Sequence, residues 1–247
     1  VGKWYYLPVL WSVIPFVNTI FFLKVPLRTL VEAEERQPLR QLLKQRLFWL
    51  FMLFMVCAGS SELAMSQWAS LFAELGLGVS KFAGDLLGPC TFAIGMGLVR
   101  FLYGVKGSKL HLERMLVLSG ILCVIGYLIT VFSPIPLISL AGCTVCGVSV
   151  AMLWPGTYSL TSRHFPRGGT AMFAVLALAG DIGCSVGPGL VGFISNAVQK
   201  YASFQMLPWI TDATEAGLKA GLLAVTIFPA VMLVGFSVLA GKKRTHP

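Results

Sequence analysis

Charged residues are scarce in this sequence. Of its 247 residues only 12% are charged, whereas 56% are hydrophobic, and a soluble domain carries about twice that charged fraction. The charges that are present do not form a basic face with interleaved aromatic residues, so the net charge of +9 does not indicate nucleic-acid binding. The composition excludes an ordinary soluble domain and predicts a membrane protein whose surroundings are the lipid bilayer.

Motifs for enzymatic or ATP-driven chemistry are also lacking. The chain has no Walker A motif and no G-x-S-x-G nucleophile elbow. His111, His164 and His246 lie in predicted loops or in the C-terminal tail, so an intramembrane hydrolase would have no base at depth. Cys143 and Cys146 form a C-x-x-C pair, but neither a second pair nor a nearby histidine completes a metal site. We expect no enzyme activity, no catalytic residue, no cofactor and no metal.

Long apolar runs fill most of the chain. Each has about 20 residues, which is enough to cross a hydrocarbon core about 30 Å thick. Backbone groups in lipid must be satisfied within the segment, and the runs lack the alternation of barrel strands, so they are predicted to be helices. The fold class is therefore all-α, a polytopic transmembrane helical bundle of about seven spans. The expected spans are Trp4–Leu23, Leu47–Leu75, Phe82–Tyr103, Met115–Phe132, Leu137–Tyr158, Thr170–Ala197 and Leu218–Ala240.

Lysine and arginine alternate between rich and poor connections. The segment after the first predicted span is rich between Lys24 and Arg46, whereas the next connection has only Lys81. The connection that begins near Lys106 is rich again, and residues 133–136 have none. By the positive-inside rule the N-terminus is predicted to lie outside and the C-terminus in the cytoplasm. We expect an integral protein of a bacterial inner membrane.

Two acidic residues, Glu62 and Asp181, lie well inside predicted spans. At about 1.5 Å per helical residue, both are far from the cytoplasmic surface. A carboxylate at this depth is costly unless it faces a cavity or a partner. We predict that both residues have a functional role. The alternative for each is a helix–helix hydrogen bond or a protonated, silent acid.

Polar and aromatic residues interrupt two of the predicted spans. The run Gly59-Ser60-Ser61-Glu62 is typical of a loosened or broken helix that lines a wet cavity. Near the cytoplasmic end of the fifth span, Trp154 and Tyr158 belong either to an interfacial belt or to a surface that stacks on a substrate. Gln67 and Trp68 follow in the same polar outer half of the second span.

A glycine pattern occurs twice. Residues 84–89 and 183–188 both read G-x-x-x-G-P, each with an acid close by. Small residues at this spacing let helix backbones approach closely. Such echoes are also typical of the internal repeats of transporters.

Residues 147–192 resemble the Major Facilitator Superfamily. The stretch reads G-V-S-V-A-M-L-W-P-G, then H-F-P-R-G-G-T-A, then A-G-D-I-G-C-S-V-G-P-G-L-V-G, which is similar to helix ten, a loop and helix eleven of that family. Residues 100–109 resemble its loop between helices eight and nine, in a form that lacks the acid–arginine pair. Residues 62–68 are similar to helix seven of the fucose-permease-like sugar transporters.

The resemblance implies a domain organisation and a function. Residues 1–24 would be the last transmembrane helix of an N-terminal bundle, 25–45 a cytoplasmic linker, and 46–247 a C-terminal six-helix bundle. The family's first five helices would be partners missing from this chain, which is then a fragment. The implied function is secondary active transport of a small polar solute, such as a sugar or related metabolite, by alternating access with ion or proton coupling. Helices seven and ten help to line the central cavity in that family. The resemblance therefore implies substrate-binding roles for the set Glu62, Gln67, Trp68, Trp154 and Tyr158, and coupling roles for Glu62 and Asp181.

Two other classes of membrane protein share features with this chain. A seven-helix receptor or sensor has the same number of spans and the same orientation. The last predicted span has only Lys219, at its outer edge, and therefore no lysine for a mid-membrane Schiff base. A polytopic membrane enzyme is disfavoured by the missing deep histidines. The glycine echo favours a transporter.

Overall fold

The computed structural model describes residues 6–25, 36–106, 111–201, 210 and 212–242. Every secondary-structure element in these ranges is a helix, which confirms the predicted all-α class. Seven helical segments are long and apolar enough to cross a membrane, as expected. They are Tyr6–Lys24, Arg46–Gly76, Lys81–Lys106, Leu112–Phe132, Pro136–His164, Gly169–Lys200 and Ala213–Gly241.

The chain divides into two compact units, Val1–Arg36 and Gln37–Pro247. The first unit contains α1 (Tyr6–Lys24), whose side chains are all exposed. Within the predicted linker at 25–45, residues 26–35 lie outside the described residues. The second unit is the helical bundle, and the functional site lies within it.

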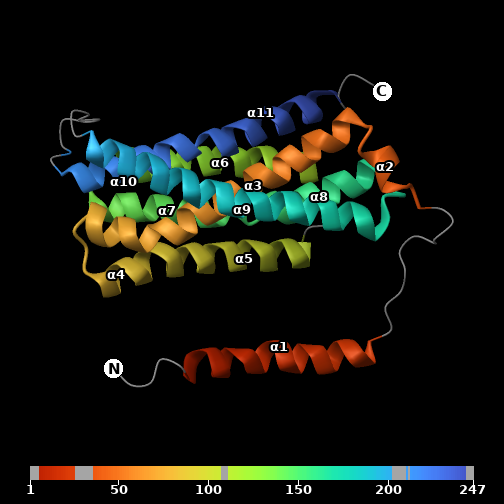
Figure 1. The fold of residues 1–247 in the computed structure, drawn as a ribbon, viewed down its shortest axis with the longest axis horizontal. Helices are drawn as coiled ribbons and strands as arrows, with labels where there is room; N and C mark the ends of the chain where they lie inside the picture. The colour runs from red at the N-terminus through yellow and green to blue at the C-terminus, as the bar shows by residue number, and fades with distance from the viewer. Residues whose placement is uncertain (1–5, 26–35, 107–110, 202–209, 211, 243–247) are drawn as a thin grey trace. The chain divides into compact units, whose positions relative to one another are not determined.

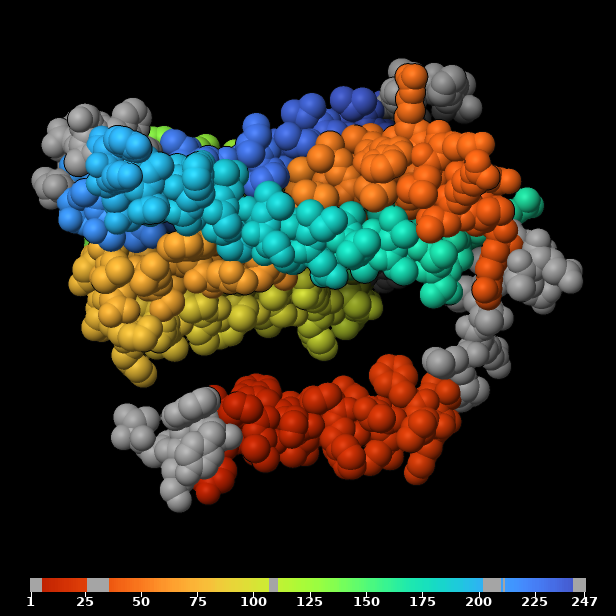
Figure 2. All heavy atoms as spheres, viewed as in Figure 1, coloured from red at the N-terminus to blue at the C-terminus, as the bar shows by residue number. Residues whose placement is uncertain are grey.

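The helical bundle is built around α3 (Figure 1). This helix packs most extensively against α9, and atoms of α3 are visible on both sides of α9 in Figure 2. Phe48, Phe51 and Phe54 of α3 are fully buried in the core. The helices of the bundle are α2 (Leu39–Leu42), α3 (Arg46–Leu71) with η2 (Phe72–Gly76), α4 (Lys81–Asp85) with η3 (Leu86–Cys90) and α5 (Thr91–Lys106), α6 (Leu112–Phe132), α7 (Pro136–Val150), α8 (Leu153–His164), α9 (Gly169–Lys200), α10 (Ala213–Val225) and α11 (Ile227–Lys242).

The predicted loosening of the helix at Gly59–Glu62 is wrong. The helix α3 is continuous from Arg46 to Leu71, because these small residues serve its packing against α9. The Ser60 hydroxyl donates to the Gly183 carbonyl at 3.0 Å, and a Cβ on Gly59 would collide with the backbone of α9. The Ser61 hydroxyl donates within α3, to Cys57 O at 2.7 Å.

Two other spans are interrupted instead, each just before a proline. The fifth span breaks between α7 and α8 at Ala151 and Met152, and the seventh between α10 and α11 at Thr226. Pro155 and Pro229 follow these breaks. Since proline has no backbone N–H and crowds the preceding turn, it favours an interruption on its N-terminal side.

Lys219 is fully buried, although the sequence places it at the outer edge of a span. Its ammonium group pairs with Glu215 at 2.9 Å and donates to the Ser133 carbonyl at 3.2 Å. The helix α10 already begins at Ala213, so Lys219 lies well inside the span. The lysine therefore ties α10 to the end of α6.

Candidate functional site

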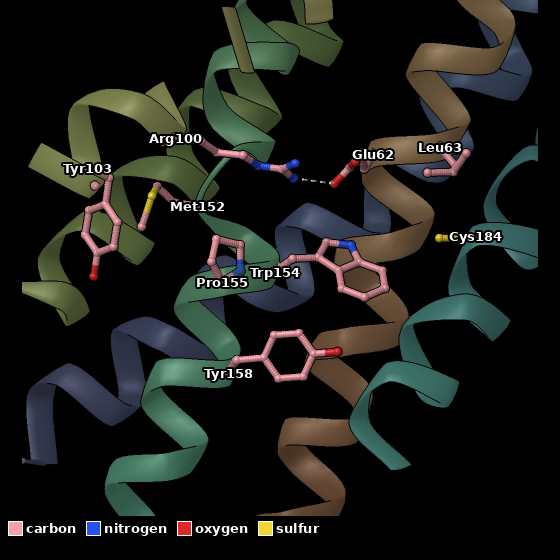
Figure 3. Close-up of a pocket in the computed structure, with 10 residues that line it drawn as sticks. Glu62, Leu63, Arg100, Tyr103, Met152, Trp154, Pro155, Tyr158 and Cys184 are labelled. Atoms are coloured by element: carbon pink, nitrogen blue, oxygen red, sulfur yellow. Dashed lines mark hydrogen bonds and ion pairs between the residues drawn. The ribbon is translucent and has the colours of Figure 1, made fainter. Parts of the chain in front are cut away.

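A cavity of about 600 Å³ opens among four segments of the bundle. The helix α3 contributes an acid and a leucine, α5 a base, an aromatic ring and a glycine, the α7–α8 break together with α8 four side chains, and α9 a thiol (Figure 3). The lining residues are Glu62, Leu63, Arg100, Tyr103, Gly104, Met152, Trp154, Pro155, Tyr158 and Cys184.

The cavity contains an ion pair between Glu62 and Arg100. Oε2 of Glu62 lies 3.5 Å from Nη2 of Arg100, and the Glu62 side chain is only 15% exposed while that of Arg100 is 42% exposed. A carboxylate and a guanidinium within a membrane span offset each other's cost of leaving water. The pair supplies the cavity with both acceptors and donors of hydrogen bonds.

Arg100 makes a second polar contact at the α7–α8 break. Its Nε donates to the carbonyl of Ala151 at 3.2 Å. The guanidinium is therefore held from two sides, by α3 and by the break.

Aromatic rings form another wall of the cavity. The ring centroids of Trp154 and Tyr158 lie 6.2 Å apart, and Tyr158 lies 5.7 Å from Phe173 of α9. Gly180 allows this arrangement, because a Cβ there would collide with the indole of Trp154. The buried Nε1 of Trp154 has no hydrogen-bond partner among the described residues. Figure 3 shows this nitrogen on the side of the ring that faces Glu62.

The structure brings together three of the predicted site residues, Glu62, Trp154 and Tyr158. Gln67 is exposed and Trp68 packs outside the cavity, so neither is among the lining residues. Trp68 lies against Gly192, and its Nε1 donates to the Pro188 carbonyl at 3.1 Å.

Asp181 lies on α9 with an exposed side chain and does not line the cavity. The backbone carbonyl of Asp181 accepts a hydrogen bond from the Ser185 hydroxyl at 3.3 Å.

Sequence reasoning missed the role of Arg100. The sequence places Arg100 near the end of the third span, next to a basic connection, whereas α5 continues to Lys106 and holds Arg100 inside the helix. The signal that could have found it is the need of Glu62 for a cation at a similar depth.

Comparison with known proteins gives one family. The sequence model of the Major Facilitator Superfamily matches residues 1–188, a range that contains Glu62, Arg100, Trp154 and Tyr158. No curated protein matches this sequence.

Proposed function

Because this chain belongs to the Major Facilitator Superfamily, a family of membrane transporters, we propose that it acts in secondary active transport of a small polar solute by alternating access. A sugar or a related metabolite is the proposed substrate class. The observation that carries this proposal is the Glu62–Arg100 pair, which faces an otherwise largely apolar cavity within the membrane spans.

The chemistry of the cavity suits a solute with both hydroxyl groups and a ring. Its volume of about 600 Å³ lies in the usual range for small-molecule sites. Glu62 accepts hydrogen bonds and Arg100 donates them, while Trp154 and Tyr158 offer ring faces to the apolar side of a sugar. Gln67 and Trp68 are proposed to contribute only in another conformation of the transport cycle.

Coupling is proposed to involve the same acid. Glu62 would take up a proton or face a coupling cation, since its charge is the one that transport must neutralise or pair. Asp181 is the second proposed coupling residue. Its exposed position on α9 suits an encounter with a further segment of the transporter.

The domain assignment also enters as a proposal. Residues 1–24 would be the last helix of an N-terminal bundle, 25–45 the cytoplasmic linker and 46–247 the C-terminal bundle. Five preceding helices would complete the transporter in a bacterial inner membrane, with the C-terminus in the cytoplasm. The similarity of residues 62–68 to helix seven of the fucose-permease-like transporters supports a substrate preference of that kind.

The proposal is tested with Glu62→Gln in proteoliposomes that contain the complete transporter. Uptake of a panel of radiolabelled monosaccharides should fall about tenfold or more for the substrate that wild type accumulates, because a charged hydrogen bond is worth about 1.5–3 kcal/mol. Gln keeps the size and polarity of the side chain, so insertion should be unchanged.

Glu74→Gln is the matched control, because Glu74 belongs to the same span and pairs with Lys81 at 3.7 Å outside the cavity. Its uptake should equal that of wild type. Unchanged transport and unchanged pH dependence in Glu62→Gln would reduce Glu62 to a structural residue. If no monosaccharide accumulates above empty liposomes, the proposed substrate class is wrong.

A further inference from the structure

The break between α7 and α8 leaves one backbone carbonyl without its helical donor. In a continuous helix the carbonyl of Ala151 would accept from the N–H of residue 155. That residue is Pro155, which has no N–H. A backbone carbonyl inside a membrane span must find another donor.

Arg100 supplies that donor. Its Nε lies 3.2 Å from the Ala151 oxygen, and its Nη2 lies 3.5 Å from Glu62 Oε2. The guanidinium is planar and rigid, so one hydrogen bond fixes the direction of the other. Figure 3 shows Arg100 extending from its helix toward Glu62 above Pro155 and Trp154.

The second proline break in the bundle is built differently. Pro229 stands four residues after Val225, as Pro155 does after Ala151. Next to this break the hydroxyl of Thr226 donates to Leu222 O at 3.2 Å. This neutral side chain serves the carbonyl of Leu222 in its own helix, whereas the carbonyl of Ala151 at the first break accepts from a cation of a neighbouring helix.

We propose that Arg100 is a positioning residue that links the charge of Glu62 to the conformation of the α7–α8 break. This rests on the proposed function, in which the Glu62 carboxylate either binds a proton or accepts a hydrogen bond from a substrate hydroxyl. When Glu62 loses its charge or its contact with Arg100, the guanidinium loses its anchor on α3. Its hydrogen bond to Ala151 then weakens, and α8 moves with Trp154 and Tyr158.

The surroundings of the pair are simple enough for this link to be specific. Among the described lining residues, Glu62 and Arg100 are the charged ones, and the other titratable groups there are Tyr103, Tyr158 and Cys184. Asp181 is the nearby acid on α9 outside the lining. Within the cavity, the charge that interacts with Arg100 is therefore that of Glu62.

Hydrogen–deuterium exchange of the transporter in nanodiscs tests the link without a substrate. In Glu62→Gln, the amides of residues 148–158 should exchange about fivefold faster than in wild type, because a neutral hydrogen bond is roughly half as strong as a charge-assisted one. Residues 222–230, around the second break, serve as the internal reference and should not change. Glu74→Gln should match wild type at both breaks.

Two further variants separate the link from general loosening. Arg100→Lys keeps the charge but loses the fork of donors, so it should speed exchange at residues 148–158, and adding Glu62→Gln should have no further effect. Pro155→Ala restores an N–H for the Ala151 carbonyl, so exchange there should become slow and insensitive to Glu62.

Unchanged exchange at residues 148–158 in Glu62→Gln would overturn the link, even if transport were lost and the proposed function stood. Faster exchange at both breaks would overturn it too, because the effect would then be global. Conversely, coupled exchange in a protein that transports no monosaccharide would keep the link and reject the proposed substrate class.

Discussion

At the scale of single residues, Trp154 combines a favourable and an unfavourable environment. Its ring packs against Gly180 and near Tyr158, which stabilises the fold. Its Nε1–H is buried without a partner among the described residues, and a buried unsatisfied donor costs about 1–3 kcal/mol. Such a cost at the wall of a cavity is typical of a group that is satisfied by a ligand.

Trp154→Phe should therefore move stability and binding in opposite directions. The substitution keeps an aromatic ring and removes the unsatisfied N–H, so the unfolding temperature in detergent should stay equal or rise, while substrate affinity should fall about five- to tenfold. Thermal unfolding and equilibrium binding of the accumulated substrate measure the two effects.

Trp68→Phe is the control, because Trp68 Nε1 already donates to Pro188 O at 3.1 Å. The loss of that hydrogen bond should lower the unfolding temperature and leave affinity nearly unchanged. A Trp154→Phe protein that is destabilised and binds normally would show that the N–H is satisfied within the fold.

The sequence predicted a functional residue where a charged side chain deep in an apolar run carries a high free-energy cost of burial. Glu62 is identified in this way, because an acid inside an apolar run is costly unless it is paired or faces a cavity. Arg100 and Lys219 did not stand out, because a basic residue near a predicted helix end is read as a loop charge. The predicted spans place both cations near a span end, whereas α5 continues to Lys106 and α10 begins at Ala213, which sets both deeper within their helices.

At the scale of helices, the two glycine patterns meet the same partner. Gly183 and Gly187 of α9 lie against the backbone of α3 at Val56 and Ser60. Residues 84 and 88 of the other pattern lie against Ala73 and Ala69 of the same span. The echo in the sequence thus corresponds to two close contacts with one central helix.

Gly187→Ala should destabilise the bundle. Its Cβ would meet backbone atoms of Ser60, so α9 would have to move away from α3, and overpacking of this kind costs about 1–3 kcal/mol. The unfolding temperature in detergent should fall by several degrees. Gly189→Ala on the same helix is the matched control, since its Cβ would meet open space. Equal unfolding temperatures for the two variants would contradict the close contact.

Helices could be predicted in number and approximate extent, because each span is an apolar run of membrane length. The position of their interruptions could not. Glycine and serine at residues 59–61 suit either a loose helix or a tightly packed one, and the partner α9 decides for packing. Pro188 lies within the continuous α9, whereas Pro155 follows a break, so proline alone does not locate one.

At the scale of the whole molecule, the ends of the helical bundle differ in charge. The helices α3, α6 and α9 begin at the end where α5 and α8 finish, and Figure 1 shows these termini together on one side of the bundle. Basic residues gather at that end. They are Arg40, Lys44, Arg46, Lys106, Arg114, Arg163 and Arg167.

The opposite end of the bundle carries fewer basic residues, and some of them are paired with acids. Lys81 pairs with Glu74 at 3.7 Å, and Lys219, buried in the span that begins at this end, pairs with Glu215. By the positive-inside rule the end rich in arginine is predicted to face the cytoplasm.

Cysteine labelling in cells should reveal this orientation. In a background with Cys90→Ser and Cys184→Ser, the remaining native cysteines are buried. Ser80→Cys, exposed between η2 and α4, should react with a membrane-impermeant maleimide in intact cells, and Thr170→Cys, exposed at the start of α9, only after permeabilisation. The reverse pattern would invert the orientation. Reaction of both sites in intact cells would mean that an odd number of the helices between them fails to cross the membrane, which would overturn the seven-span assignment as well.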